Sequence, residues 1–204
     1  MIRVSLLIWK QIKGAGAAVT EGFRKEEWAN RAINHPAGRI AEFWLKHCHF
    51  RQRESNGQIP GFPGWLKGPL ADMVEGADLA SQLGRVTLGL HLRFVYHVDP
   101  AWTTAQLFPK LRFQIVKEEA YLMWEPHAGY GELSRDLILV MPPIYLEAFS
   151  PFCDVDGYLL TGFFRHISGI IYSCLIDVNE GNWFKDFLFG LSTDQKAHWA
   201  KQME

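Results

Sequence analysis

The sequence predicts an all-α fold of short helices stacked as helix pairs, in the manner of an α-solenoid of the HEAT or armadillo kind. Apolar side chains recur at three- and four-residue spacing along most of the chain, which is the period of a helix with one buried face. Glycine and proline divide the chain into short segments. The chain has 204 residues, of which 48% are hydrophobic, and this is enough to fill a core. Because no strict sequence period is present, the solenoid arrangement rests on the lengths of the expected helices.

The start of the chain differs in character from the rest, so we leave residues 1–25 unassigned beside an α-helical module at residues 26–204. Met1–Ile8 is a candidate strand, and its apolar run is too short for a secretory signal. Gly14-Ala15-Gly16, which follows that run, resembles the turn that opens a sirtuin-type dinucleotide fold. A dinucleotide site also needs a complete βαβ unit and a later acidic residue. Helical character begins already at Glu26, so we expect no cofactor here.

The clearest helix is expected at residues 36–51. Its apolar side chains recur at helical spacing, while its charged residues lie elsewhere on the cylinder. Asn34-His35-Pro36 predicts its start, because a cap-competent residue stands before a proline whose fixed φ suits the first turn. The residues of the predicted buried face are Ile40, Phe43, Trp44, His47 and Cys48.

Shorter helices are expected in the middle of the chain. One ends at Gly76 and the next at Gly84, because glycine commonly follows the last turn of a helix. Residues 86–95 alternate in character with a period of two, as a strand does. We interpret them as helix, since a lone strand would leave its backbone groups unpaired. Asp99-Pro100 predicts the N-cap and first turn of a helix that reaches Leu107.

Three more helices are expected toward the end of the sequence. Leu160–Cys174 carries apolar side chains at helical spacing over about four turns, which predicts a largely buried helix. Trp183–Leu191 predicts another. Ser192 and Gln195 have the spacing of a capping box, in which each side chain pairs with the backbone N–H of the other residue. They predict the start of the last helix.

The composition excludes several classes of protein. With a net charge of −1, the chain has no overall positive potential that would attract nucleic acid or anionic lipid. Residues 1–60 carry ten basic and five acidic side chains and residues 61–204 eleven and seventeen, but the basic residues are dispersed, so we interpret them as a solvated surface. The most apolar longer segment, Thr161–Leu175, is too short to span a bilayer. The cysteines are too few and too scattered for a disulfide framework or a zinc site, and indicate reduced thiols in a cytoplasmic protein. They are Cys48, Cys153 and Cys174.

Candidate reactive groups are sparse. In His47-Cys48-His49 the two histidines lie about 200° apart around a helix, so they cannot bind one metal ion. A small enzyme with a polar pocket of Glu42, His47 and His91 is the alternative hypothesis. No serine, cysteine or histidine stands in the sequence context of a catalytic nucleophile. The eight tryptophans and fourteen phenylalanines fall on apolar stripes, which favours core packing over a platform for stacking bases.

One run of the chain resembles a known bacterial domain. The run from Trp28 to Leu45, above all its core Ala-Ile-Asn-His-Pro-Ala-Gly at residues 32–38, is similar to a signature of the bacterial domain of unknown function 4020. That domain is found toward the C-terminal end of large sirtuin-like defence proteins. Later landmarks resemble the same domain in the same order, so the resemblance covers about residues 26–204. They are Leu83-Gly84-Arg85, Val98-Asp99-Pro100-Ala101-Trp102 and the run from Asn182 to Ser192.

The resemblance implies a helical module of a multidomain anti-phage protein, in which any NAD hydrolysis belongs to a sirtuin-like domain elsewhere. It carries over no catalytic, cofactor-binding or metal-binding residue, and we expect no enzymatic activity from this chain. We interpret its motif residues as structural: they form a capped helix start, and the glycine permits a second helix to approach closely. They are Asn34, His35, Pro36, Gly38, Glu42 and Trp44.

The favoured hypothesis is a non-catalytic interaction or regulatory module in the bacterial cytoplasm, which senses a phage component or scaffolds a sirtuin-like partner. We expect a protein partner or self-association, and neither a membrane nor a nucleic acid. Nucleic-acid binding through the basic first third is a third hypothesis, which predicts salt-dependent retention on DNA or RNA.

Overall fold

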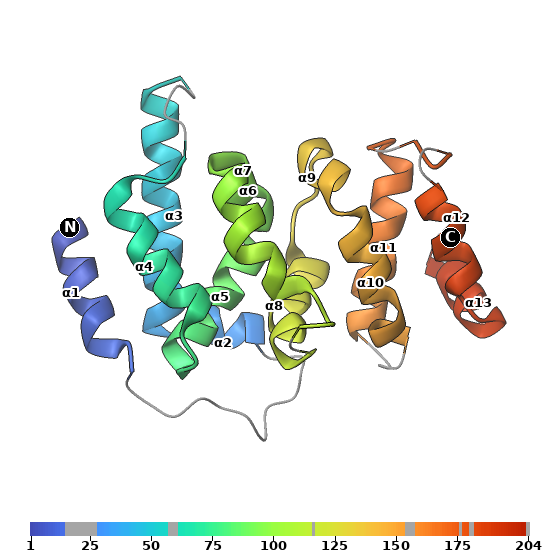
Figure 1. Ribbon diagram of the computed structural model, residues 1–204, viewed down its shortest axis with the longest axis horizontal. Helices are drawn as coiled ribbons and strands as arrows, with labels where there is room; N and C mark the ends of the chain where they lie inside the picture. The colour runs from blue at the N-terminus through green and yellow to red at the C-terminus, as the bar shows by residue number, and fades with distance from the viewer. Residues whose placement is uncertain are drawn as a thin grey trace.

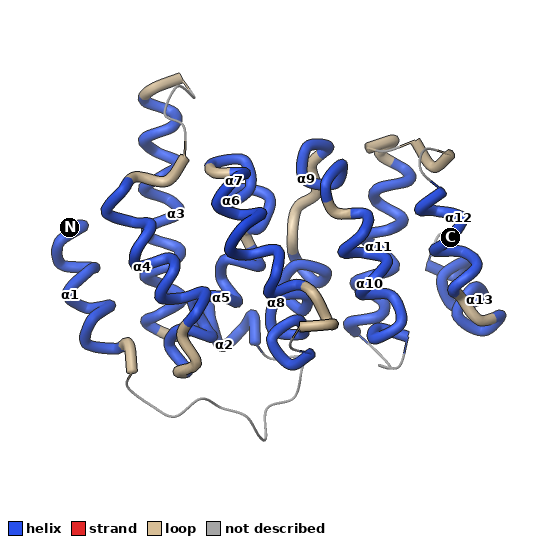
Figure 2. The backbone as a smooth tube through the Cα atoms, in the orientation of Figure 1, coloured by secondary structure: helices blue, strands red, loops and turns tan. Residues whose placement is uncertain are grey.

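The computed structural model describes residues 1–14, 28–56, 61–115, 117–153, 158–175, 177–179 and 182–202. Every regular element in these residues is a helix, so the all-α prediction is confirmed (Figure 2). Apart from α2, which lies beside α5 and α8, the elements follow one another along the long axis of the molecule, from α1 at one end to α12 and α13 at the other (Figure 1). In chain order they are α1 (Ile2–Ile12), α2 (Trp28–Asn34), α3 (Pro36–Glu54), α4 (Gly64–Glu75), α5 (Leu79–Leu90), α6 (Leu92–Val98), α7 (Pro100–Trp102), η1 (Thr103–Leu107), η2 (Phe108–Leu111), α8 (Lys117–Tyr130), α9 (Arg135–Val140), α10 (Pro142–Cys153), α11 (Tyr158–Tyr172), α12 (Trp183–Gly190) and α13 (Thr193–Gln202).

The row of helices shares one core. A single cluster of buried apolar side chains runs from Trp9 in α1 to Trp199 in α13. The helices range from 3 residues in α7 to 19 in α3, so the described elements contain no unit of constant length. The HEAT- or armadillo-like arrangement therefore stays a prediction.

The candidate strand at Met1–Ile8 is wrong, because these residues lie in helix α1. A strand there would have no neighbour to pair with, whereas a helix closes its own backbone hydrogen bonds. The inner face of α1 packs on α3: the rings of Trp9 and Trp44 meet edge to face at 6.1 Å, and the Trp44 Nε1–H donates to Ser5 Oγ over 2.9 Å. The outer side of α1 carries exposed apolar side chains as well, Val4, Leu7 and Ile8 at 58, 62 and 44%, beside the exposed Arg3 and Lys10.

The joint between α2 and α3 follows from the motif at residues 32–38, with one correction. The N-cap of α3 is His35, whose Nδ1 accepts from the Ala37 N–H over 3.1 Å. Asn34 is instead the last residue of α2, and its amide donates to the Asn30 carbonyl. A Cβ on Gly38 would lie 2.0 Å from the carbonyl oxygen of Ala32, so only glycine fits where α3 meets α2.

Helix α5 lies at the centre of the described fold and contacts α2, α3, α4 and α8. The helix end predicted at Gly84 is wrong, because α5 continues to Leu90. Gly84 instead allows α4 to approach, since a Cβ there would lie 2.8 Å from Met73 Cγ and Sδ. Residues 86–95, which alternate like a strand, are helical in α5 and α6, as predicted.

Arg85 joins three helices from a fully buried position. Its guanidinium donates to three carbonyl oxygens at the end of α4, those of Met73, Val74 and Gly76, over 2.7 to 3.0 Å. Met73 and Val74 lie in the last turn of α4 and Gly76 directly follows it, so these carbonyls have no partner within the helix. The same guanidinium reaches Glu119 of α8 at 3.4 Å. Arg85 therefore fixes the end of α4 against α5 and α8.

The helix predicted from Asp99 is present, and Asp99 is its cap. Its carboxylate accepts from the Trp102 N–H at 3.0 Å and from the Phe62 N–H at 3.1 Å, and it pairs with Lys67. The chain stays helical past the predicted end at Leu107, through a π-helical turn in η1 and a 3₁₀ turn in η2.

The C-terminal helices lie where the sequence predicts them. The predicted capping box is confirmed, because the Ser192 N–H donates to Gln195 Oε1 at 2.8 Å and the Gln195 N–H donates to Ser192 Oγ at 3.2 Å. Helix α11 is buried along Phe163, Phe164 and Ile167. Cys174 was predicted on that face, but α11 ends at Tyr172 and the Cys174 side chain is exposed.

Candidate functional site

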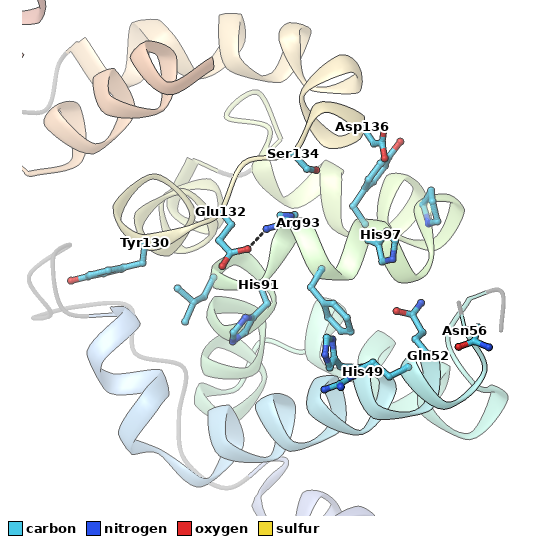
Figure 3. A pocket seen from close by; sticks show the side chains of 15 residues that line it. His49, Gln52, Asn56, His91, Arg93, His97, Tyr130, Glu132, Ser134 and Asp136 are labelled. Carbon is cyan, nitrogen blue, oxygen red and sulfur yellow. Dashed lines mark hydrogen bonds and ion pairs between the residues drawn. The ribbon is translucent and has the colours of Figure 1, made fainter. Parts of the chain in front are cut away.

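A wide groove opens between the C-terminal half of α3, helix α6 and the connection from α8 to α9 (Figure 3). Its volume is about 1160 Å³. This volume is slightly above the usual range of ligand pockets, and the mixed polar and aromatic lining is that of a protein interface. The lining residues are His49, Gln52, Arg53, Asn56, Leu90, His91, Arg93, Phe94, Tyr96, His97, Pro100, Tyr130, Glu132, Ser134 and Asp136.

Two walls of the groove come from α3 and from the α5–α6 junction. Residues three and four apart share one face of a helix, so α3 directs His49, Gln52 and Arg53 to the same side, and Asn56 joins them from the turn that follows α3. His91 ends α5 and precedes α6, which places it at the bend of the second wall. The imidazole of His49 and the ring of Phe94 meet at 5.6 Å and join the two walls.

The third wall is acidic and is tied to the second. Arg93 Nη1 pairs with the carboxylate of Glu132 across the groove (Figure 3). Ser134 is the N-cap of α9, and its hydroxyl accepts from the Leu137 N–H at 3.4 Å. Asp136 lies in the first turn of α9, where a negative charge is favourable. The serine of the groove is thus engaged in helix capping.

The three imidazoles of the groove do not form a metal site. His49, His91 and His97 come from three different elements, and no group of three His, Cys, Asp or Glu side chains in the described residues is arranged to hold an ion. Burial lowers the pKa of His91, against the opposing charge of Glu42. His91 is therefore neutral at pH 7.

The alternative enzyme pocket is not assembled. Glu42 lies within electrostatic range of His91, but its carboxylate pairs with Lys46 at 2.7 Å, and that hydrogen bond holds the pKa of Glu42 below its usual value. His47 points the other way and packs on Trp65 of α4, with 6.0 Å between the rings. The structure therefore separates His47 from the other two residues of the hypothesis.

The motif residues make contacts within the fold. His35 caps α3, Pro36 forms its first turn, and Gly38 lies against α2. Trp44 bonds to α1. Residues of two later landmarks also have structural roles, Gly84 and Arg85 at the α4–α5 joint and Asp99 as a cap. The motif therefore marks joints between helices.

The glycine turn at Gly14 is not part of a dinucleotide site of the kind considered above. The run before it, Val4–Trp9, is helical in α1, so the strand that such a site requires is missing from this position. The next two residues of the turn, Ala15 and Gly16, lie outside the described residues.

Sequence reasoning missed a buried network of three side chains. Tyr145 Oη lies 2.9 Å from His166 Nδ1 and 3.3 Å from His127 Nε2, and His166 Nε2 lies 3.3 Å from the Gly131 carbonyl oxygen. Because a carbonyl only accepts, His166 Nε2 carries the proton, Tyr145 donates to His166 Nδ1, and His127 Nε2–H donates to Tyr145. Only the fold brings these residues together, and no spacing in the sequence signals them.

Burial keeps the network neutral. It lowers the pKa of His166 to about 4, lowers the pKa of His127 well below its usual value, and raises that of Tyr145. All three groups are nearly inaccessible to solvent. The network therefore fixes α8, α10 and α11 relative to one another.

A second buried polar group lies at the start of α2. Glu125 of α8 is 1% exposed, and its carboxylate accepts from the Ala29 N–H at 3.1 Å. Burial raises the pKa of Glu125 to about 7, and the hydrogen bond from Ala29 partly offsets that rise. This carboxyl therefore titrates near neutral pH inside the fold.

No protein family, curated protein or solved structure matches this chain. Within the described residues, no helix combines the length and the apolar character needed to cross a membrane. Cys48 and Cys174 are free thiols, and burial raises the pKa of Cys48 to about 11, so Cys48 is unreactive at neutral pH.

Proposed function

We propose that the chain is a non-catalytic interaction module that docks a protein partner in the groove between α3, α6 and α9. The main support for this proposal is that several polar groups of the groove already have partners within the fold. Arg93 pairs with Glu132, Ser134 caps α9, and His49 packs on Phe94. What is left is an open surface with exposed aromatic, guanidinium and amide groups.

The arrangement of this surface differs from that of an active site. An active site brings a nucleophile or base and its orienting partner into mutual contact in a place that excludes water. The imidazoles of this groove stand apart on separate elements, and its serine is a cap. Arginine and aromatic side chains in an open groove are typical of protein recognition.

The cellular context of the proposal comes from the resemblance at residues 28–45 and its later landmarks. It supports a bacterial anti-phage protein in the cytoplasm, in which this module senses a phage component or scaffolds a sirtuin-like, NAD-consuming partner. The motif supplies the joints of the module, and the groove supplies the binding surface.

The test is site-specific photo-crosslinking in bacteria that carry the chain and its neighbouring genes, during phage infection. A photoreactive phenylalanine analogue replaces His97, which is exposed in the groove, or Phe189, which is 73% exposed on α12 and serves as the control. We expect a discrete protein adduct from position 97 and none from position 189. Equal adducts at both positions, or turnover of NAD by the purified chain alone, would refute the proposal.

A further inference from the structure

Three cations stand in one row along the outward face of α3. Arg39, Lys46 and Arg53 are all exposed and are spaced by seven residues, which is two helical turns. At a rise of about 1.5 Å per residue, their Cα atoms lie about 10.5 Å apart along the helix axis. Arg53 also lines the groove, so the row leads directly into it.

The charge of this row is not balanced on α3. Lys46 pairs with Glu42, but the guanidinium groups of Arg39 and Arg53 make no hydrogen bond or ion pair within the described part of the chain. The other acid of α3, Glu54, follows Arg53 and points about 100° away around the helix. Among the described residues, the row therefore presents a cation without an ion pair at each end and a paired one in the middle, and Arg39 lies within electrostatic range of Glu42.

Apolar side chains lie beside the row. Phe50 is 57% exposed on the same helix, and Leu90 and Phe94 line the adjoining groove. The surface thus offers a line of cations with apolar side chains on either side of it, Phe50 on one side and those of the groove on the other. The segment that fits it has acids along one edge and apolar residues along the next.

We infer that the groove and the row together bind an amphipathic helix of a partner protein whose acidic residues recur every seven positions. Such a helix places its carboxylates at the same spacing of about 10.5 Å as the cations of α3. Its apolar face then lies in the groove, which is the helix-in-groove mode of recognition. This inference rests on the proposed function and specifies the chemistry of the partner.

A protein helix fits this surface better than a nucleic acid. Glu132 and Asp136 form the wall opposite α3, and they would repel a phosphate backbone that carries charge on every side. A helix directs its acids to α3 alone and turns a different face to the acidic wall. The cations of the row also lack interleaved aromatic side chains on α3 apart from Phe50.

The experiment measures binding of labelled peptides to the full chain by fluorescence anisotropy at low salt. The probe is a helix-forming peptide of about 21 residues with glutamates seven apart and leucines on the adjacent face. A second peptide has the same composition with the glutamates distributed around the helix. A labelled single-stranded DNA is the third probe. We expect the first peptide to bind at least about tenfold more tightly than the second.

Charge reversal locates the site. Arg39→Glu with Arg53→Glu should weaken binding of the first peptide by at least about tenfold, because two attractive pairs become repulsive. The matched control is Arg3→Glu with Lys10→Glu, which makes the same change of net charge on exposed residues of α1. We expect this control to change binding by less than about twofold at the same ionic strength. Unfolding midpoints of both double variants establish that the fold is retained.

Three results would overturn the inference. If the two double variants weaken binding of the first peptide equally, the overall charge of the chain attracts the peptide and no defined site on α3 binds it. Tighter binding of the DNA, lost in the α3 variant, would assign the row to nucleic acid. Equal binding of the two peptides, or none of either, would show that acids at seven-residue spacing are not recognised, while a protein adduct at position 97 would still leave the proposed function standing.

Discussion

The carboxyl group of Glu125 makes stability depend on pH in an unusual direction. Its pKa rises from 4.5 to about 7 on folding, because the group is buried. The folded chain therefore holds this proton more tightly than the unfolded chain. The contribution of Glu125 to stability is most favourable below pH 4.5, falls as the pH rises toward 7, and then levels off.

Glu125→Gln should remove this effect, because a neutral amide still accepts from the Ala29 N–H. The full shift corresponds to about 3 kcal/mol. At about pH 8 we expect the variant to be more stable than the wild type by up to that amount, and at about pH 5 by less than about 1 kcal/mol. Urea unfolding at both pH values measures this. Glu118→Gln, at an exposed position of the same helix, is the control, and an equal gain from it would contradict the assignment.

Arg85 tests whether a buried cation holds three helices together. Arg85→Met keeps the bulk but leaves three carbonyl oxygens of α4 without their donor. We expect a loss of about 3 kcal/mol in the free energy of unfolding. Arg93→Met breaks an exposed ion pair and should cost less than about 1 kcal/mol. Similar losses of unfolding free energy in the two variants would show that the buried contacts of Arg85 stabilise the fold no more than an exposed ion pair does.

At the scale of elements, glycines set how closely the helices approach. A methyl group on Gly38 meets backbone of α2, which cannot move aside without opening the α2–α3 joint. Gly38→Ala should therefore destabilise the fold by about 3 kcal/mol or more. Gly64→Ala in the first turn of α4 adds its methyl group to open space and should stabilise the fold by about 0.5 kcal/mol. Thermal unfolding distinguishes the two, and a tolerated Gly38→Ala would mean that the joint is loose.

The elements also show what the sequence could and could not predict. The start of α3 and the Ser192–Gln195 cap were predictable, because a cap depends on residues next to each other. The role of Gly84 was not, since a glycine that ends a helix and a glycine that lies against Met73 look the same in sequence. Met1–Ile8 was ambiguous for a related reason: an apolar run becomes strand or helix according to the neighbours it finds.

The candidate site was less predictable than the fold. Its three walls bring together His49, His91 and Tyr130, which are far apart in the chain. Only His91 entered a predicted pocket, and the two residues grouped with it, Glu42 and His47, occupy different faces of α3. A groove of this kind depends on how elements pack, and single-sequence periodicity gives only the faces of each element.

At the scale of the whole molecule, α1 lies at one end of the row of helices, and Trp9 is its most deeply buried side chain. Trp9→Ala removes its contact with Trp44, so we expect faster amide hydrogen exchange throughout α1 and unchanged protection in α8 and α11. Leu7→Ala, on the outer face of the same helix, should leave the exchange of α1 nearly unaltered. Loss of protection across the entire chain in Trp9→Ala would show that α1 is required for the rest of the fold.

The exposed apolar side chains on the outer side of α1 also govern how this end of the row behaves in water. Stacked helices normally finish with a polar side, which keeps the end from adhering to other molecules. Here a further helix, fused to the chain or brought by another molecule, lengthens the array without breaking any existing buried contact. The same exposed side chains favour adhesion between copies of the chain, so we expect self-association to increase with protein concentration.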